Sequence, residues 1–116
     1  SSQYFIEGVI AYSNKAKEVI LKIPHYMIEK NGAVSKPIAS LMAQRIRKIA
    51  KTDFGIGITG IAGPTGATLK KPVGTVFIAI DSEDKKICKK IHFTGNRASV
   101  RQKAALKALE LLKTII

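Results

Sequence analysis

Apolar and polar residues follow one another along this chain in patterns that predict alternating strands and helices. Residues 4–12 are rich in β-branched and aromatic side chains, which is typical of a strand. A helix is expected over 15–21, because Asn14 can cap its start and Pro24 stops it. A short helical turn is expected over 25–30. The buried side of the first helix is predicted to hold Ala16, Ile20 and Leu21.

Two longer helices are predicted further along. The first follows Ser35, a good N-cap, and tolerates Pro37 in its first turn. Its apolar stripe at helical spacing holds Ile38, Leu41, Met42, Ile46 and Ile49. The second helix is expected over 98–115, after Gly95-Asn96-Arg97. Its predicted apolar stripe is Ala105, Ala108, Leu109, Leu112, Ile115 and Ile116.

Three further strands are predicted between these two helices. Residues 54–59 predict a short buried strand, and a loop rich in Gly, Thr and Lys follows over 59–72. The apolar run 76–80 predicts the next strand, and the polar residues 81–84 predict a tight turn. Residues 86–93 then predict a half-exposed edge strand. The two faces of this last strand hold Ile87, Ile91 and Phe93 on one side and Cys88, Lys90 and His92 on the other.

This order of elements indicates a single α/β domain over residues 1–116. A helix between the first two strands favours a parallel or mixed sheet covered by helices. The strands over 76–80 and 86–93, joined by the tight turn, should pair antiparallel. We therefore expect three layers, α/β/α, around a mixed, mostly parallel sheet. The chain reaches its first strand almost at once. An α/β domain could start in this way, and an N-terminally truncated one would look the same.

The composition narrows the class of protein. The formal net charge of +12 makes anionic partners plausible. The lysines are scattered, however, and aromatic residues are few, so nucleic acid is not expected as a partner. The single cysteine, Cys88, rules out an internal disulfide and suits a reducing compartment. Without a signal peptide or an apolar run near 18 residues, the sequence predicts a soluble, cytoplasmic protein that does not span a membrane.

A glycine-rich stretch over 54–76 is the first candidate for a binding site. It holds six of the nine glycines, and such loops leaving a buried strand often approach ligands in α/β proteins. An ordinary glycine-rich connection is the equal alternative. The letters of 55–60 match a dinucleotide fingerprint, but they lie within a strand and do not open a helix, so we reject that motif.

Lys17 is the strongest candidate for chemistry. With Asn14 as cap, it is the third residue of a helix, where the helix dipole disfavours a cation. Partial burial would lower its pKa further and let it act as a general base or meet an anion. A solvated surface lysine is the plain alternative.

Four other side chains have both a functional and a structural interpretation. Tyr12 ends a strand and is either functional or a packed aromatic, whereas Arg97 near a helix start either clamps a phosphate or is solvated. His25 and His92 lack metal-ligand spacing and are interpreted as structural. No metal and no cofactor are expected.

Five linked motifs resemble one family. They run from Gly8 to Lys17, from Gly32 to Ser35, from Thr59 to Pro64, from Lys71 to Val76 and from Gly95 to Arg97. In order and spacing they are similar to the CinA C-terminal domain, the nicotinamide mononucleotide deamidase family, over the whole chain. The resemblance implies a metal-free amidohydrolase that converts nicotinamide mononucleotide to nicotinate mononucleotide and ammonia, and that forms homo-oligomers.

The resemblance also implies roles for individual residues. Members resemble serine amidases in which a lysine is the base, and the matching lysine is Lys17. The positions that match those near the substrate are Tyr12, Thr59, Gly60, Gly63 and Arg97. The expected partner is therefore nicotinamide mononucleotide or a related small nucleotide.

The chain departs from the family pattern in one decisive place. The nucleophilic serine of the family lies in a Ser-x-Thr-Gly-Gly motif upstream of Gly8, and this sequence contains no such motif. We therefore expect a domain truncated at its N-terminus relative to the family and inactive alone. Asn96, Ala67 and Leu69 also replace residues that are common in the family.

Three readings follow for function. The first is an amidohydrolase domain, as part of a longer enzyme or as a degenerate member. The second is a non-catalytic nucleotide-binding or interaction module derived from that family. The third and weakest is nucleic-acid binding through the net charge, which would show a steep salt dependence.

Overall fold

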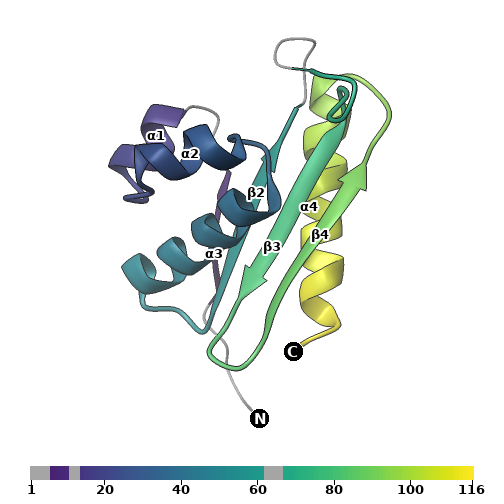
Figure 1. Ribbon diagram of the computed structural model, residues 1–116. Helices are drawn as coiled ribbons and strands as arrows, with labels where there is room; N and C mark the ends of the chain where they lie inside the picture. Colours follow the sequence, from purple (N-terminus) through teal and green to yellow (C-terminus); the bar gives the residue numbers. More distant parts are fainter. Residues whose placement is uncertain (1–5, 11–13, 62–66) are drawn as a thin grey trace.

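A computed structural model describes residues 6–10, 14–61 and 67–116 (Figure 1). The predicted order of strands and helices is confirmed. The elements are β1 (Ile6–Ile10), α1 (Asn14–Val19), α2 (His25–Asn31), α3 (Lys36–Ala50), β2 (Phe54–Gly60), β3 (Thr75–Asp81), β4 (Lys86–His92) and α4 (Arg97–Lys113).

The four strands form one mixed sheet in the order β1-β2-β3-β4. β1 runs parallel to β2, as the intervening helices predicted. β2 pairs antiparallel with β3, and β3 antiparallel with β4. The expectation of a mostly parallel sheet is therefore wrong. No helix crosses over between β2 and β3 in the described part of the chain, so β3 returns beside β2 in the opposite direction.

Helices cover both faces of this sheet and make three layers (Figure 1). On one face Ala39 and Ala43 of α3 pack with Phe77 and Ala79 of β3. On the other face α4 packs against β2, β3 and the inner side of β4. That larger cluster holds Phe54, Ile56, Ile58, Val76, Ile78, Ile80, Val100, Ala104, Ala108 and Leu112. The two predicted faces of β4 are confirmed, since Ile87, Ile91 and Phe93 lie against α4 and Cys88 against α3.

The apolar stripes of the helices are only partly as predicted. Ile49 is 54% exposed, because α3 lies on the sheet through its small residues Ala39 and Ala43. Ile20 is also exposed, since α1 ends at Val19 before it. α4 buries a row at intervals of four residues, and the prediction that Ala105, Leu109 and Ile116 are buried is wrong. The buried row is Val100, Ala104, Ala108 and Leu112.

Glycines in β2 allow α3 to lie directly on the strand. A Cβ atom at Gly57 would be 2.5 Å from the Ala39 carbonyl oxygen and 2.7 Å from the Ala43 nitrogen. A Cβ atom at Gly55 would meet the Ala43 carbonyl oxygen even more closely. These neighbours are helix backbone, which cannot move aside as a flexible side chain could. The glycines of β2 therefore set the distance between α3 and the sheet.

A buried ion pair joins α3 to the last two strands. Asp81, at the end of β3, is buried, and its carboxylate accepts from Arg47 Nε of α3 at 2.7 Å. The other carboxylate oxygen accepts from Lys86 Nζ of β4 at 2.9 Å. Two cations thus compensate the desolvation of one buried carboxylate. Among the described residues, no helix is long and apolar enough to span a bilayer.

The close packing of α3 on β2 predicts a large effect of one methyl group. Gly57→Ala should lower the free energy of unfolding by about 3 kcal/mol, because the added atom overlaps the backbone of α3. Urea denaturation monitored by circular dichroism measures this change. Ala105→Gly, which alters one methyl group at an exposed helix position, is the matched control and should cost only about 1 kcal/mol. Equal effects of the two changes would contradict close packing.

Candidate functional site

The described residues predicted to form the site lie at, or shortly after, the carboxyl ends of strands. These strand ends all lie at one edge of the sheet. β1 and β2 are parallel, so Ile10 and Ile58 lie side by side near that edge. β4 runs in the same direction as β2, because both are antiparallel to β3. The connection from β4 to α4 therefore starts at this edge, and Arg97 begins α4. The fold places Thr59 and Gly60 at the carboxyl end of β2 and the start of α4 after the carboxyl end of β4. The carboxyl ends of strands are a common place for ligands in α/β sheets.

Lys17 lies in α1, the first helix after β1, and only 2% of its surface is exposed. Burial lowers the pKa of its amine below the ordinary value, because the charged form loses hydration. The sequence predicted Asn14 as a cap, but Asn14 is itself the first helical residue. In a helix of six residues Lys17 also belongs to the last turn, so the dipole argument does not apply. Burial is the cause of the lowered pKa.

Thr59 is buried near the end of β2 and makes a specific contact. Its hydroxyl donates a hydrogen bond to the carbonyl oxygen of Ala33 at 2.9 Å. The hydroxyl proton is therefore used by the protein, and only its oxygen lone pairs remain to accept from a ligand. Gly60 follows, where a Cβ atom would be 2.9 Å from Val76 Cγ2 and 3.0 Å from the Thr75 carbonyl oxygen, so a side chain there would crowd β3.

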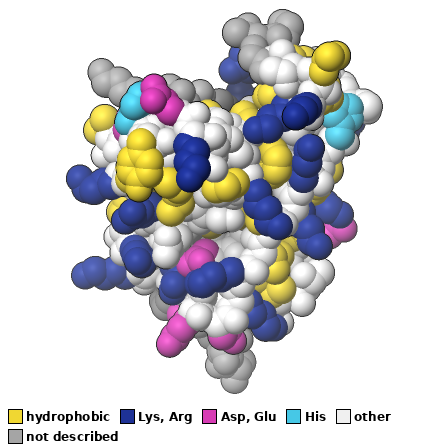
Figure 2. All heavy atoms as spheres, in the orientation of Figure 1, with side chains coloured by type: hydrophobic (Ala, Val, Ile, Leu, Met, Phe, Trp, Pro, Cys, Tyr) yellow, Lys and Arg dark blue, Asp and Glu magenta, His cyan; other side chains and the backbone are white. Residues whose placement is uncertain are grey.

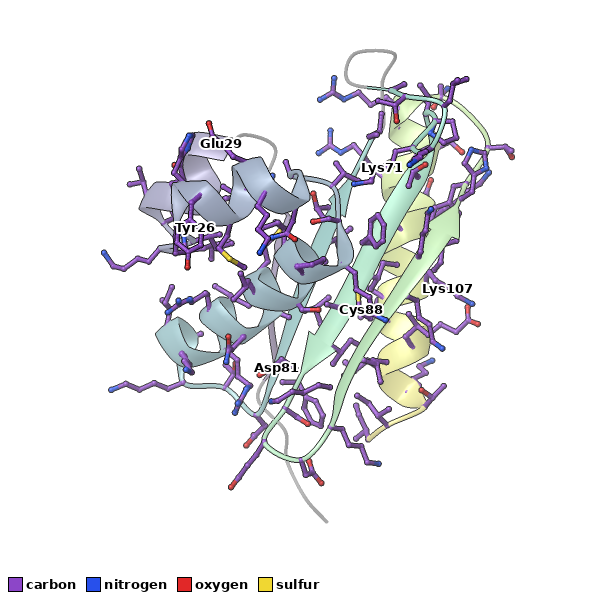
Figure 3. All side chains as sticks on the ribbon, viewed as in Figure 1. Tyr26, Glu29, Lys71, Asp81, Cys88 and Lys107 are labelled. Atoms are coloured by element: carbon purple, nitrogen blue, oxygen red, sulfur yellow. The ribbon has the colours of Figure 1, made fainter. Side chains whose placement is uncertain are left out.

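The segment Gly32–Val34, which joins α2 to α3, is held by three side chains. The Gly32 carbonyl accepts from Ser35 Oγ at 2.8 Å, the Ala33 carbonyl accepts from Thr59, and the Val34 carbonyl accepts from Lys71 Nζ at 2.6 Å. Ser35 also caps α3 as predicted, accepting from the Ile38 amide. Figure 3 shows Lys71 at the end of the sheet where α4 begins.

Sequence reasoning did not assign a role to Lys71. The residue was visible only as part of the Lys71-Pro72 pair that leads back into the sheet. A lysine in a loop is ordinarily solvated, and nothing in the pattern of the chain indicates that it reaches a carbonyl 37 residues away. The available signal was that the segments 32–35 and 71–76 both belong to motifs that resemble the CinA C-terminal domain.

Arg97 occupies the first position of α4 and is exposed to solvent. Asn96 caps the helix by accepting from the Ser99 amide at 2.9 Å. The positive φ of Gly95, +120°, turns the chain into the helix. Arg97 is thus free to extend towards an anion from a fixed backbone position. Tyr12 and Gly63, the remaining predicted site residues, lie outside the described residues.

The histidines and the cysteine have structural contacts elsewhere. His25 bridges Glu18 of α1 and Glu29 of α2 at 2.7 and 2.9 Å, and these carboxylates raise its pKa. His92 Nε2 lies 2.8 Å from the Val73 carbonyl. Burial raises the pKa of the Cys88 thiol, which disfavours the reactive thiolate. Within the described ranges, no three His, Cys, Asp or Glu residues are grouped so that they could hold a metal ion.

Basic side chains are spread over the face that carries α3, β3 and β4 (Figure 2). Apolar and uncharged atoms separate them, so they form no continuous stripe on this face. A groove that follows a nucleic-acid backbone normally has such a stripe. The expectation that nucleic acid is not a partner stays a prediction.

The model of one protein family, the CinA C-terminal domain, matches residues 1–116. This chain belongs to the CinA C-terminal domain family. A CinA-like protein of Kosmotoga olearia is 46% identical over 112 residues, which are 97% of this chain. A CinA-like protein of Syntrophus aciditrophicus is 44% identical over 114 residues. The expected family is thereby confirmed.

Solved structures of CinA superfamily proteins share the fold. The protein from Escherichia coli superposes with a TM-score of 0.91 at 24% identity, over 98% of this chain and 81% of that one. The protein from Enterobacter cloacae has a TM-score of 0.88 at 26% identity, over 96% and 81%. The CinA domain described here spans 27% of the length of both curated relatives.

The burial of Lys17 predicts that its amine has a lowered pKa. Its amine should lose its proton below the value of about 10.4 that is usual for lysine. Between the lowered pKa and about 10.4 the unfolded chain binds more protons, so the contribution of Lys17 to stability rises with pH there. NMR of 13C-labelled lysine side chains measures this pKa, and Lys17→Met assigns the signal. An ordinary pKa for Lys17 would contradict its burial.

Proposed function

We propose that this domain forms the main part of an amidohydrolase that acts on nicotinamide mononucleotide or a closely related nucleotide. The reaction would give nicotinate mononucleotide and ammonia. The observation that carries the proposal is a buried lysine of lowered pKa in α1. This helix follows β1, whose carboxyl end lies beside that of β2. Membership in the CinA family supports the proposal.

Lys17 is the general base of the proposed mechanism. A lysine with a lowered pKa has a larger neutral fraction near neutral pH, and only the neutral amine can accept a proton. The serine would come from a Ser-x-Thr-Gly-Gly segment, which this sequence does not contain. Its oxygen attacks the carboxamide carbon while Lys17 takes the hydroxyl proton. The C–N bond then breaks, the proton passes to the leaving ammonia, and water hydrolyses the acyl-serine ester.

Other residues at this edge would bind the substrate. Arg97 can pair with the phosphate from the start of α4. The hydroxyl of Thr59 holds the Ala33 carbonyl and offers the ligand only its lone pairs. The Ile61 amide already donates to the Thr75 carbonyl at 2.9 Å and is not a donor for an oxyanion. Amide donors for the oxyanion would therefore come from elsewhere at this edge.

A non-catalytic nucleotide-binding module is the second candidate. The buried Thr59 and the exposed Arg97 lie at this end of the sheet and could bind a nucleotide without a nucleophile. Such a module would bind the same nucleotide at the same edge without hydrolysing it. The two candidates can be distinguished by adding the serine segment to this chain. Only the enzyme would then gain activity.

Ammonia release from nicotinamide mononucleotide tests the proposal. The chain of 116 residues should release none, and the chain extended by a family segment bearing Ser-x-Thr-Gly-Gly should be active. In the extended chain Lys17→Ala should lower kcat by about a hundredfold or more, as expected for loss of a general base. A coupled glutamate dehydrogenase assay measures the ammonia.

Lys30→Ala is the control, since Lys30 is an exposed lysine on α2. It should leave kcat unchanged. Activity of the unextended chain would refute the need for the serine. An extended chain that binds the nucleotide without releasing ammonia would favour the non-catalytic module, and full activity of Lys17→Ala would remove Lys17 as the base.

A further inference from the structure

Side-chain hydrogen bonds fix the backbone segment Gly32–Val34. Each of its three successive carbonyls accepts a hydrogen bond from a side chain, and the three donors come from different parts of the fold. Ser35 belongs to the cap of α3, Thr59 to the end of β2, and Lys71 to the connection between β2 and β3. The segment thus lies against the same strand end as the proposed site.

Lys71 is the one charged donor of the three and is itself held in place. Its backbone closes a turn with Thr68, whose amide donates to the Lys71 carbonyl at 2.9 Å and whose hydroxyl accepts from the Lys71 amide at 3.0 Å. The ammonium also lies 5.9 Å from the centre of the Phe77 ring. The side chain is half-buried. These contacts direct the ammonium to the Val34 carbonyl at 2.6 Å.

We propose that Lys71 is a positioning residue for the nucleotide site: by binding the Val34 carbonyl it holds Gly32–Val34 against Thr59 and so fixes one wall of that site. The proposal rests on the proposed function. A hydrogen bond from a charged donor is shorter and stronger than a neutral one, so it can fix a loop that has no regular structure. Binding and catalysis depend on such placement, because small displacements of a wall cost affinity.

Lys90 provides a matched control within the same chain. Its ammonium lies 5.9 Å from the Phe77 ring, as that of Lys71 does, but it comes from β4. Among the hydrogen bonds of the described residues, only the bond from Lys71 reaches the Val34 carbonyl. Lys90→Met therefore removes one contact with the ring, whereas Lys71→Met removes the ring contact and the bond to the segment.

Amide hydrogen exchange tests whether Lys71 holds the segment in the chain as it stands. Lys71→Met should speed exchange about tenfold or more at two amides that flank the segment, because loss of a charged hydrogen bond frees the segment. These are the Gly32 amide, which donates to the Ile28 carbonyl, and the Ile38 amide, which donates to Ser35 Oγ. Lys71→Arg, which keeps a donor and a charge, should restore much of the protection. Lys90→Met should leave these residues unchanged. Equal exchange in Lys71→Met and Lys90→Met would overturn the proposal.

The effect on the site is measured in the extended, active chain. Lys71→Met should raise KM for nicotinamide mononucleotide about fivefold or more and change kcat less, because a wall of the site has moved while Lys17 remains. Lys71→Arg should recover most of the affinity. Faster exchange with an unchanged KM would show a purely structural role and overturn the proposal. If the extended wild-type chain has no activity, the proposed function is contradicted instead. The exchange rates would then still show whether Lys71 holds the segment.

Discussion

The close approach of α3 to β2 is the constraint on which this domain depends. Because Gly55 and Gly57 have no side chains, the backbone of α3 lies directly on the strand, with Ala39 and Ala43 at the contact. That contact places the start of α3, and the segment before it, over the end of β2. The hydrogen bond from Thr59 to Ala33 and the bond from Lys71 to Val34 then become possible. The packing of small residues in the core therefore positions the candidate site.

Much of the fold follows from local patterns in the sequence. The order of elements, the Ser35 cap and the antiparallel β3–β4 pair could be predicted, because capping, turns and strand periodicity act over a few residues. The direction of β3 relative to β2 was not predicted, since it depends on the long connection that precedes β3. The buried side of α4 was also mistaken. Leu106 and Leu109 are exposed while Ala104 and Ala108 are buried, so hydrophobicity alone does not distinguish its two sides.

The candidate site, like the fold, could be predicted only in part from the sequence. Lys17 could be selected from its expected position in the first turn of a helix, although burial and not the helix dipole lowers its pKa. The resemblance to the CinA family, since confirmed, pointed to Thr59, Gly60 and Arg97. Neither route could find Lys71, because its contact with Val34 joins parts of the chain that only tertiary packing brings together. The proposed base is thus suggested by the sequence, whereas the proposed role of Lys71 rests on a contact seen only in the structure.

The central claim is that a nucleotide binds where β1, β2 and β4 end, between Gly32–Val34 and the start of α4. Titration of nicotinamide mononucleotide into the 15N-labelled chain, followed by amide chemical shifts, tests it most directly. The account predicts that the largest shifts occur at residues 33–35, 59–61 and 97. Shifts gathered instead around Asp81 at the opposite edge of the sheet, or no shifts at all, would contradict it.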